Sequence, residues 1–103
     1  MSVTVVATMF PVPEHRAEVV AVLEKTIVDV HAHDDGCLLY ALQEGDDRLV
    51  MIEKWSDAAA LETHGKGPAI AELTRALSGK LTRPMDLQVL RPHPAGTPEQ
   101  GQL

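Results

Sequence analysis

The sequence has little cysteine, few aromatic residues and no excess of basic charge. Among its 103 residues there is one cysteine, Cys37, so no disulfide can form within the chain. A single thiol is typical of a reducing compartment, and we expect a cytoplasmic protein. Aromatic residues make up 3% of the chain, as one Trp, one Tyr and one Phe. The hydrophobic core must therefore be aliphatic, built from Val, Leu, Ile, Ala and Met.

The scarcity of basic residues excludes two classes of partner. Nine Lys and Arg oppose fifteen Asp and Glu, which gives a formal net charge of -6, and the basic residues form no cluster. Nucleic acids and anionic membrane surfaces are bound by clustered positive charge, so neither is an expected partner. No segment approaches the ~20 apolar residues of a membrane span. Residues 1–6 lack the basic region with which a signal peptide starts, and we expect none.

The hydrophobic pattern predicts alternating strands and helices. Runs of β-branched residues indicate strands, and apolar residues spaced three and four apart indicate helices. Ser56 is the expected N-cap of the second helical segment, with Asp57 in its first turn. The expected elements are a strand at 3–9, a helix at 14–32, strands at 37–43 and 49–55, a helix at 56–64 that resumes at Pro68, and a strand at 85–90.

This order predicts an α+β protein of the ferredoxin-like βαββαβ type, in which the helices cover one face of a four-stranded antiparallel sheet. Residues 1–92 form this one domain, and the segment 93–103 is expected to be a disordered C-terminal tail. Strands 3–9 and 37–43 are apolar on both faces, so the face without helices would expose apolar side chains. Large apolar patches usually mark interfaces, and we expect a homodimer that forms through these sheet faces.

Trp55 and His64 flank the expected junction between a strand and a helix. An imidazole titrates near neutral pH and is the usual proton acceptor of enzymes. An indole offers a flat apolar face and one N–H donor. Two structural alternatives stay open: Trp55 as a core residue that closes one end of the sheet, and His64 as a surface histidine at a helix C-terminus.

A group of histidines and acids at 31–35 does not predict a metal site. His31 and His33 are two residues apart, and residues at this spacing do not share one face of a helix. With Asp34 and Asp35 beside them, the group is typical of a solvated loop. We therefore expect no metal.

Three segments are informative when taken together: Gly36-Cys37-Leu38-Leu39-Tyr40, Val50-Met51-Ile52-Glu53-Lys54-Trp55 and Ala60-Leu61-Glu62-Thr63-His64. They resemble the antibiotic biosynthesis monooxygenase domain, most closely its small quinol-monooxygenase-like bacterial members, and the likeness spans roughly Val3 to Pro92. The resemblance implies a dimeric ferredoxin-like α/β barrel with a pocket between sheet and helices in each protomer. It also implies, for some members, oxygenation of quinols or polycyclic phenols without metal, flavin or haem, so no cofactor is expected.

The implied chemistry gives roles to individual residues. A phenol or quinol anion reduces O₂ directly, so the protein has to remove a proton, hold the anion and exclude water. His64 is the candidate base, Trp55 the flat platform beside the substrate, and Tyr40 a hydrogen-bond donor to the oxyanion. Glu53 shares strand parity with Trp55 and is placed to orient the base. The predicted set is catalytic His64 and Trp55 with substrate-binding Tyr40, Glu53, Met51 and Thr8.

Other interpretations stay open. The face on which Tyr40 lies depends on the hairpin register, because a slip of one residue reverses it. For Glu53, pairing with a cation beside Lys54 or on the partner chain at the dimer seam is favoured over a catalytic role. The chain has no Asn, which haem-degrading relatives carry on the first strand, so haem degradation is not favoured. The alternative function is a non-catalytic, or an isomerase-type or lyase-type, dimeric α/β barrel that binds a small apolar ligand without consuming O₂.

Overall fold

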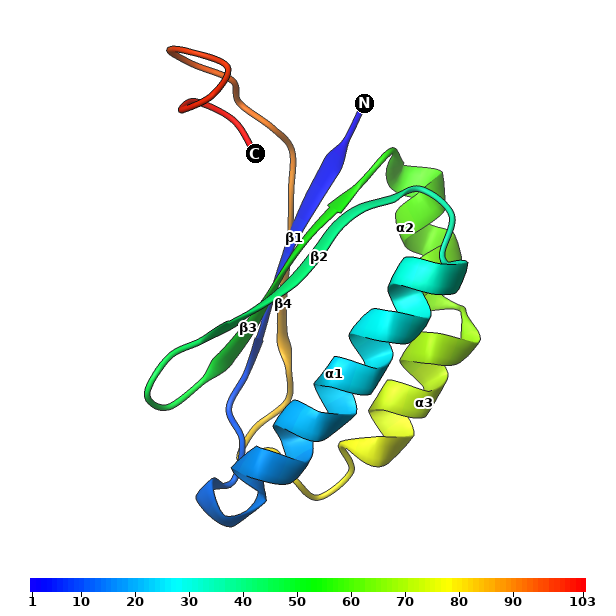
Figure 1. The fold of residues 1–103 in the computed structure, drawn as a ribbon, viewed down its shortest axis with the longest axis vertical. Coiled ribbons are helices and arrows are strands. Elements are labelled where there is room, and N and C mark those ends of the chain that lie inside the picture. The colour runs from blue at the N-terminus through cyan, green and yellow to red at the C-terminus, as the bar shows by residue number, and fades with distance from the viewer.

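The computed structural model describes residues 1–103 and has three α-helices on one side of a four-stranded sheet (Figure 1). The predicted elements are confirmed, with boundaries that differ by one or two residues. Strand β1 (Val3–Met9) leads through a short 3₁₀ turn (Pro13–His15) into α1 (Arg16–His33), followed by the hairpin of β2 (Cys37–Glu44) and β3 (Leu49–Trp55). The chain returns through α2 (Ala58–Gly65) and α3 (Pro68–Ala76) to β4 (Asp86–Leu90).

All neighbouring strands are antiparallel, in the order β2-β3-β1-β4, which is the predicted ferredoxin-like arrangement. The register places four residues in one row across the helix-covered face, namely Tyr40, Glu53, Val5 and Val89. The next row on that face, roughly 7 Å further along the strands, consists of Leu42, Met51, Ala7 and Leu87. Tyr40 and Glu53 are therefore neighbours on this face and are surrounded by apolar side chains.

The core lies between the sheet and the helices α1 and α3, and it is aliphatic apart from Tyr40 and Trp55. Val19, Leu23 and Val30 of α1 are fully buried. Burial of each such side chain stabilises the folded state by about 1.5–3 kcal/mol, because apolar surface is removed from water. Thr26 is buried on the same side of α1, and its hydroxyl donates to the carbonyl of Val22 at 3.0 Å, so burying it leaves no polar group unpaired.

The junction between β3 and α2 differs from the prediction. Asp57, not Ser56, is the N-cap: its carboxylate accepts a hydrogen bond from the N–H of Ala60 at 2.8 Å, and the helix begins at Ala58. The N–H of Ser56 donates instead to the carbonyl of Gly36 at 2.8 Å, so Ser56 extends the contact between the hairpin strands. Gly36 has a φ of +81°, and a Cβ there would lie 2.6 Å from the Cβ of Ala60. Glycine therefore allows the loop before β2 to pack against α2.

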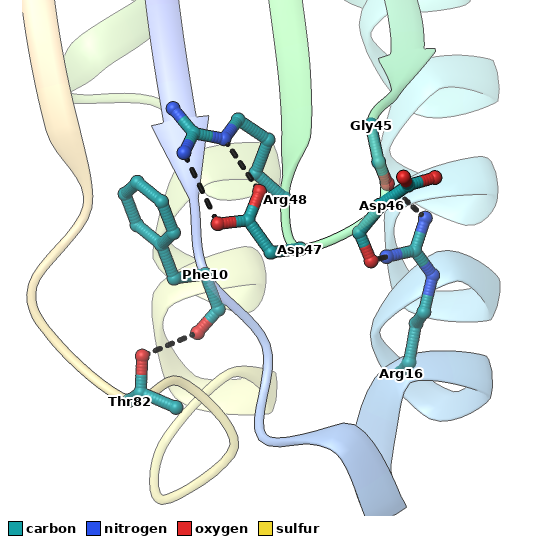
Figure 2. Close-up of polar contacts among 7 residues, drawn as sticks. All are labelled: Phe10, Arg16, Gly45, Asp46, Asp47, Arg48 and Thr82. Atoms are coloured by element: carbon teal, nitrogen blue, oxygen red, sulfur yellow. Dashed lines mark hydrogen bonds and ion pairs between the residues drawn. The ribbon is translucent and has the colours of Figure 1, made fainter.

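The opposite end of the hairpin is fastened to α1, as Figure 2 shows. Arg16 donates to the backbone carbonyls of Gly45 at 2.9 Å and of Asp46 at 3.1 Å, in the turn that joins β2 to β3. In the same turn, Arg48 makes two hydrogen bonds to the carboxylate of Asp47. Together with the contacts at the β3–α2 junction, these bonds hold the hairpin at both ends and favour a single register.

The sheet face opposite the helices has no helix or strand packed on it (Figure 1). Residues 93–103 contain no helix or strand, and one hydrogen bond, from Lys54 Nζ to the backbone O of Leu103 at 2.7 Å, links them to β3. The disorder predicted for this segment stays a prediction. None of the helices combines the length and the apolar character that a bilayer crossing requires.

Candidate functional site

A cavity of about 580 Å³ lies between the sheet and α3. Its size is within the range of small-molecule pockets, about 300–1,000 Å³. Inward-facing residues of β1, β3 and β4 form one wall, and α3 with the turn after it forms the other, almost wholly through aliphatic side chains. Leu87 and Val89 of β4 line the cavity and are still 59% and 62% exposed. The cavity is therefore open along β4, where no helix covers the sheet.

Three ionisable side chains from three elements meet at one end of this cavity. Tyr40 of β2 lies opposite Glu53 of β3, and His64 comes from the last turn of α2. The rings of Tyr40 and His64 are 5.4 Å apart, edge to face. All three side chains are buried. The register, with its irregularity between Cys37 and Leu39, places Tyr40 on the helix-covered face.

His64 is held by a residue that the sequence did not predict. Its Nδ1 lies 2.5 Å from Oδ2 of Asp34, which follows the last turn of α1, and the two side chains are 5% and 13% exposed. The sequence pattern predicted a solvated loop at Asp34. Asp34 and His64 are 30 residues apart, so no local spacing signals their contact.

Three polar atoms at this end of the cavity have no partner within the protein: Tyr40 Oη, Glu53 Oε2 and His64 Nε2. Every buried side-chain nitrogen or oxygen atom in the structure has a hydrogen-bond partner. The three unpartnered atoms must therefore reach open space, and their side chains line the cavity. A ligand at this end of the cavity meets a hydroxyl donor, a carboxyl group and an imidazole nitrogen.

Trp55 lies behind His64 and outside the cavity. It is fully buried, with its ring centroid 4.3 Å from that of His64 and 6.3 Å from that of Tyr40. Its indole N–H donates to Glu53 Oε1 at 2.9 Å. The structure brings Trp55 and His64 together, as the sequence predicted, but Trp55 supports the imidazole and the carboxyl group instead of lining the cavity as a substrate platform.

Burial sets the electrostatics of the polar end. It raises the pKa of Glu53, a rise that the Trp55 N–H and the nearby His64 oppose. It also raises the pKa of the Tyr40 hydroxyl, and the carboxylates of Glu53 and Asp34 add to the increase. Tyr40 is therefore a neutral hydrogen-bond donor at physiological pH. The same burial disfavours additional negative charge at this end of the cavity.

The raised pKa of Glu53 predicts a stabilising substitution. The pKa of Glu53 is 4.5 in the unfolded chain and higher in the folded protein. At a pH between these two pKa values, the folded protein binds more protons than the unfolded chain, so stability falls as the pH rises. Glu53→Gln has no charge and keeps an oxygen for the Trp55 N–H. We expect it to raise the Tm at neutral pH, with the gain disappearing below pH 4.5. Thermal melts at both pH values check this, and an equal change at both would contradict it.

The remaining predicted residues fall on different faces. Met51 lines the cavity, whereas Thr8 lies outside it, because its neighbours Ala7 and Met9 take the inward positions on β1. The sequence did not predict the contributions of α3 and β4, including Leu73, Thr74 and Leu87, which line the opposite wall and the opening. No three His, Cys, Asp or Glu side chains lie together as a metal site would require.

A ferredoxin-like α+β domain with an apolar cavity that ends at a buried imidazole defines the class of protein. The profile of the family described as antibiotic biosynthesis monooxygenase matches residues 2–76, which contain Tyr40, Trp55 and His64. The chain belongs to the antibiotic biosynthesis monooxygenase family, as the resemblance of its segments predicted.

Known proteins agree with this assignment. Rv0793 of Mycobacterium tuberculosis, provisionally named a monooxygenase, is 34% identical over 92 residues, which cover 87% of this chain and 90% of that protein. The solved structure of Rv0793 matches with a TM-score of 0.86 and 30% identity, over 94% of this chain and 100% of that one. The structure of PA3566 from Pseudomonas aeruginosa has a TM-score of 0.78 and 27% identity, over 86% and 91% of the two chains.

Proposed function

We propose that the protein is a cofactor-independent monooxygenase that oxidises a small quinol or polycyclic phenol with O₂ in the cavity between the sheet and the helices. The observation that carries the proposal is the His64 imidazole, whose Nδ1 is bound to Asp34 and whose Nε2 is unpartnered at the polar end of an apolar cavity. Membership of the antibiotic biosynthesis monooxygenase family supports monooxygenase-type chemistry. The single thiol supports a cytoplasmic location as part of the same proposal.

His64 starts the proposed reaction by accepting the proton of the substrate hydroxyl on Nε2. The resulting anion transfers one electron to O₂, and the substrate radical and superoxide combine at a ring carbon to form a peroxide. Loss of water from the peroxide leaves a new oxygen on the ring. One quinol and one O₂ thus give one hydroxyquinone and one water, and all four electrons that reduce O₂ come from the substrate.

The other residues of the cavity support these steps. The hydroxyl of Tyr40 is a neutral donor that stabilises the oxyanion beside His64. Aliphatic side chains such as Met51 and Leu73 exclude water, which would otherwise divert the radical and the peroxide. Trp55 contributes through the imidazole and the Glu53 carboxyl that it contacts.

Oxygen consumption tests the proposal directly. We expect purified protein, stripped of metals with a chelator, to accelerate O₂ uptake in the presence of at least one member of a panel of quinols and anthrones. Product analysis with ¹⁸O₂ should show one labelled atom in the organic product and one in water. No uptake above the protein-free rate across the panel would contradict the proposal, and aromatic binding without uptake would favour a non-catalytic or isomerase-type barrel.

We also propose that two copies pair through the sheet face opposite the helices. The centre of this face is apolar, the rim is polar, and none of the central apolar side chains is fully buried in the single chain: Val6, Leu39, Ala41, Val50 and Ile52. An apolar centre within a polar rim is typical of a protein interface. A second copy is the proposed occupant, as the resemblance to the family implies.

A charge placed on this face tests the homodimer. Leu39 of the edge strand β2 is 36% exposed in the single chain, so a lysine fits there without disturbing the core. We expect Leu39→Lys to convert a dimer into a monomer in sedimentation velocity at micromolar concentration. Val28→Lys, at an exposed position of α1, is the matched control and should leave the dimer intact. A monomeric wild-type protein would contradict the proposal.

A further inference from the structure

We infer that Asp34 is the positioning residue of this site: it fixes the tautomer and orientation of His64 and balances the positive charge that His64 acquires. Asp34 lies outside the cavity and does not touch a substrate in it, so its effect passes through the imidazole. The catalytic consequence rests on the proposed function, whereas the tautomer and the orientation do not.

The chemistry of the contact determines the tautomer. An ionised carboxylate only accepts hydrogen bonds, so the proton between Asp34 Oδ2 and His64 Nδ1 belongs to the imidazole. The neutral ring then carries no proton on Nε2, which is the nitrogen that faces the cavity. A free imidazole samples both tautomers, and only the one with a bare Nε2 is able to accept a proton from a ligand in the cavity.

The backbone around Asp34 holds the carboxylate in place. The N–H of Asp34 donates to the carbonyl of Val30 at 3.0 Å, and the carbonyl of Asp34 accepts from the N–H of Cys37 at 3.3 Å. Between these bonds, Gly36 brings the loop against the start of α2, the helix that carries His64. The two members of the pair are therefore fixed by the same junction, which is the kind of rigid support that a precise site requires.

The charges around His64 single out Asp34 as its counter-ion. The titratable groups that face the imidazole are Asp34 from the end of α1, Tyr40 from β2 and Glu53 from β3. Tyr40 is neutral, and the Glu53 carboxyl already accepts the indole N–H of Trp55. Cys37, next to Asp34, has a thiol whose pKa is raised by burial. Asp34 alone makes a direct hydrogen bond to the ring.

Nitrogen NMR of the His64 side chain tests the tautomer without any turnover. At a pH where the ring is neutral, we expect wild type to show a protonated Nδ1 and a bare Nε2. Asp34→Asn keeps the size of the side chain, but its amide donates as well as accepts, so the tautomer with a protonated Nε2 should become populated. Asp35→Asn removes the same charge from an exposed neighbour and should leave the His64 signals as they are in wild type.

Kinetics with a quinol that the protein oxidises test the catalytic consequence. We expect Asp34→Asn to lower kcat by about 100-fold with little change in KM. Asp34→Glu should recover part of the rate, and Asp35→Asn should match wild type. A residue that only stabilised the fold would lower the Tm without changing the His64 tautomer.

The results separate this inference from the proposed function. An unchanged His64 tautomer in folded Asp34→Asn, or equal shifts in Asp34→Asn and Asp35→Asn, would overturn the positioning role even if quinol oxidation is robust. Absence of O₂ uptake with every quinol would overturn the proposed function, and the NMR result would still decide whether Asp34 sets the imidazole. Asp34→Ala, which removes every hydrogen-bonding group, is the second variant and should populate the protonated Nε2 at least as much as Asp34→Asn.

Discussion

Removal of the His64 imidazole is expected to lower kcat/KM for quinol-dependent O₂ consumption by about 100- to 10,000-fold, the range associated with loss of a general base. The cavity contains no other side chain in a position to replace it. Tyr40 is a neutral phenol, and Glu53 is held by the Trp55 N–H. His64→Ala leaves the aliphatic walls in place, so the substrate should still bind. An oxygen electrode gives the rate, and fluorescence quenching by the quinol gives the affinity.

Two controls make the His64 result specific. His33→Ala removes an exposed imidazole from the last turn of α1 and should keep the wild-type rate. Added imidazole should partly restore the rate of His64→Ala, because the substitution leaves a hole of matching shape next to the substrate. A wild-type rate in His64→Ala, with the protein folded, would remove His64 from the mechanism and with it the proposed reaction.

Truncation of Trp55 is expected to have the largest effect on stability. Its side chain is fully buried, and substitutions of buried large aromatic residues by Ala cost about 3–5 kcal/mol of the 5–15 kcal/mol that typically stabilise a domain. Trp55→Ala also leaves Glu53 Oε1 without its donor. Denaturant unfolding followed by far-UV circular dichroism measures the loss, since the only tryptophan is no longer present as a fluorophore.

Two further variants serve as comparisons for the stability of Trp55→Ala. Trp55→Phe keeps an aromatic ring and removes the N–H, so it should cost less than Trp55→Ala. Leu38→Ala, at an exposed position of β2, should change stability by no more than about 0.5 kcal/mol. A loss below about 1 kcal/mol in Trp55→Ala would show that the indole is not part of the core, and would reopen its assignment as a substrate platform.

The proximity of Trp55 and His64 was predictable because the two residues are close in the sequence. Trp55 and His64 are joined by a strand end and a two-turn helix, so their proximity follows from local structure. Glu53 shares strand parity with Trp55, and both lie on the inward face. Thr8 was placed without such support, and the parity of β1 puts it outside the cavity.

The contact between Asp34 and His64 was beyond the reach of the sequence pattern. The two residues are 30 positions apart and belong to elements that meet only after both helices have packed on the sheet. Asp34 follows two histidines at a helix end, a context that usually indicates solvent. Asp34 is 13% exposed beside the loop whose Gly36 approaches Ala60 closely, and that approach is a matter of tertiary packing. The position of Trp55 relative to the cavity also depended on tertiary packing. The sequence predicted that Trp55 lies near His64, but not that the indole lies outside the cavity.

The sequence by itself determined the order of strands and helices and the ferredoxin-like class, because hydrophobic periodicity and turn residues act over a few positions. Family membership was recognisable for the same reason, since its segments are short and contiguous. Only the tertiary structure decided the face of Tyr40, the partner of His64 and the opening of the cavity along β4. These features depend on strand register and on helix placement. A register shift of one residue moves a side chain to the other face of the sheet, and no short stretch of sequence specifies the register.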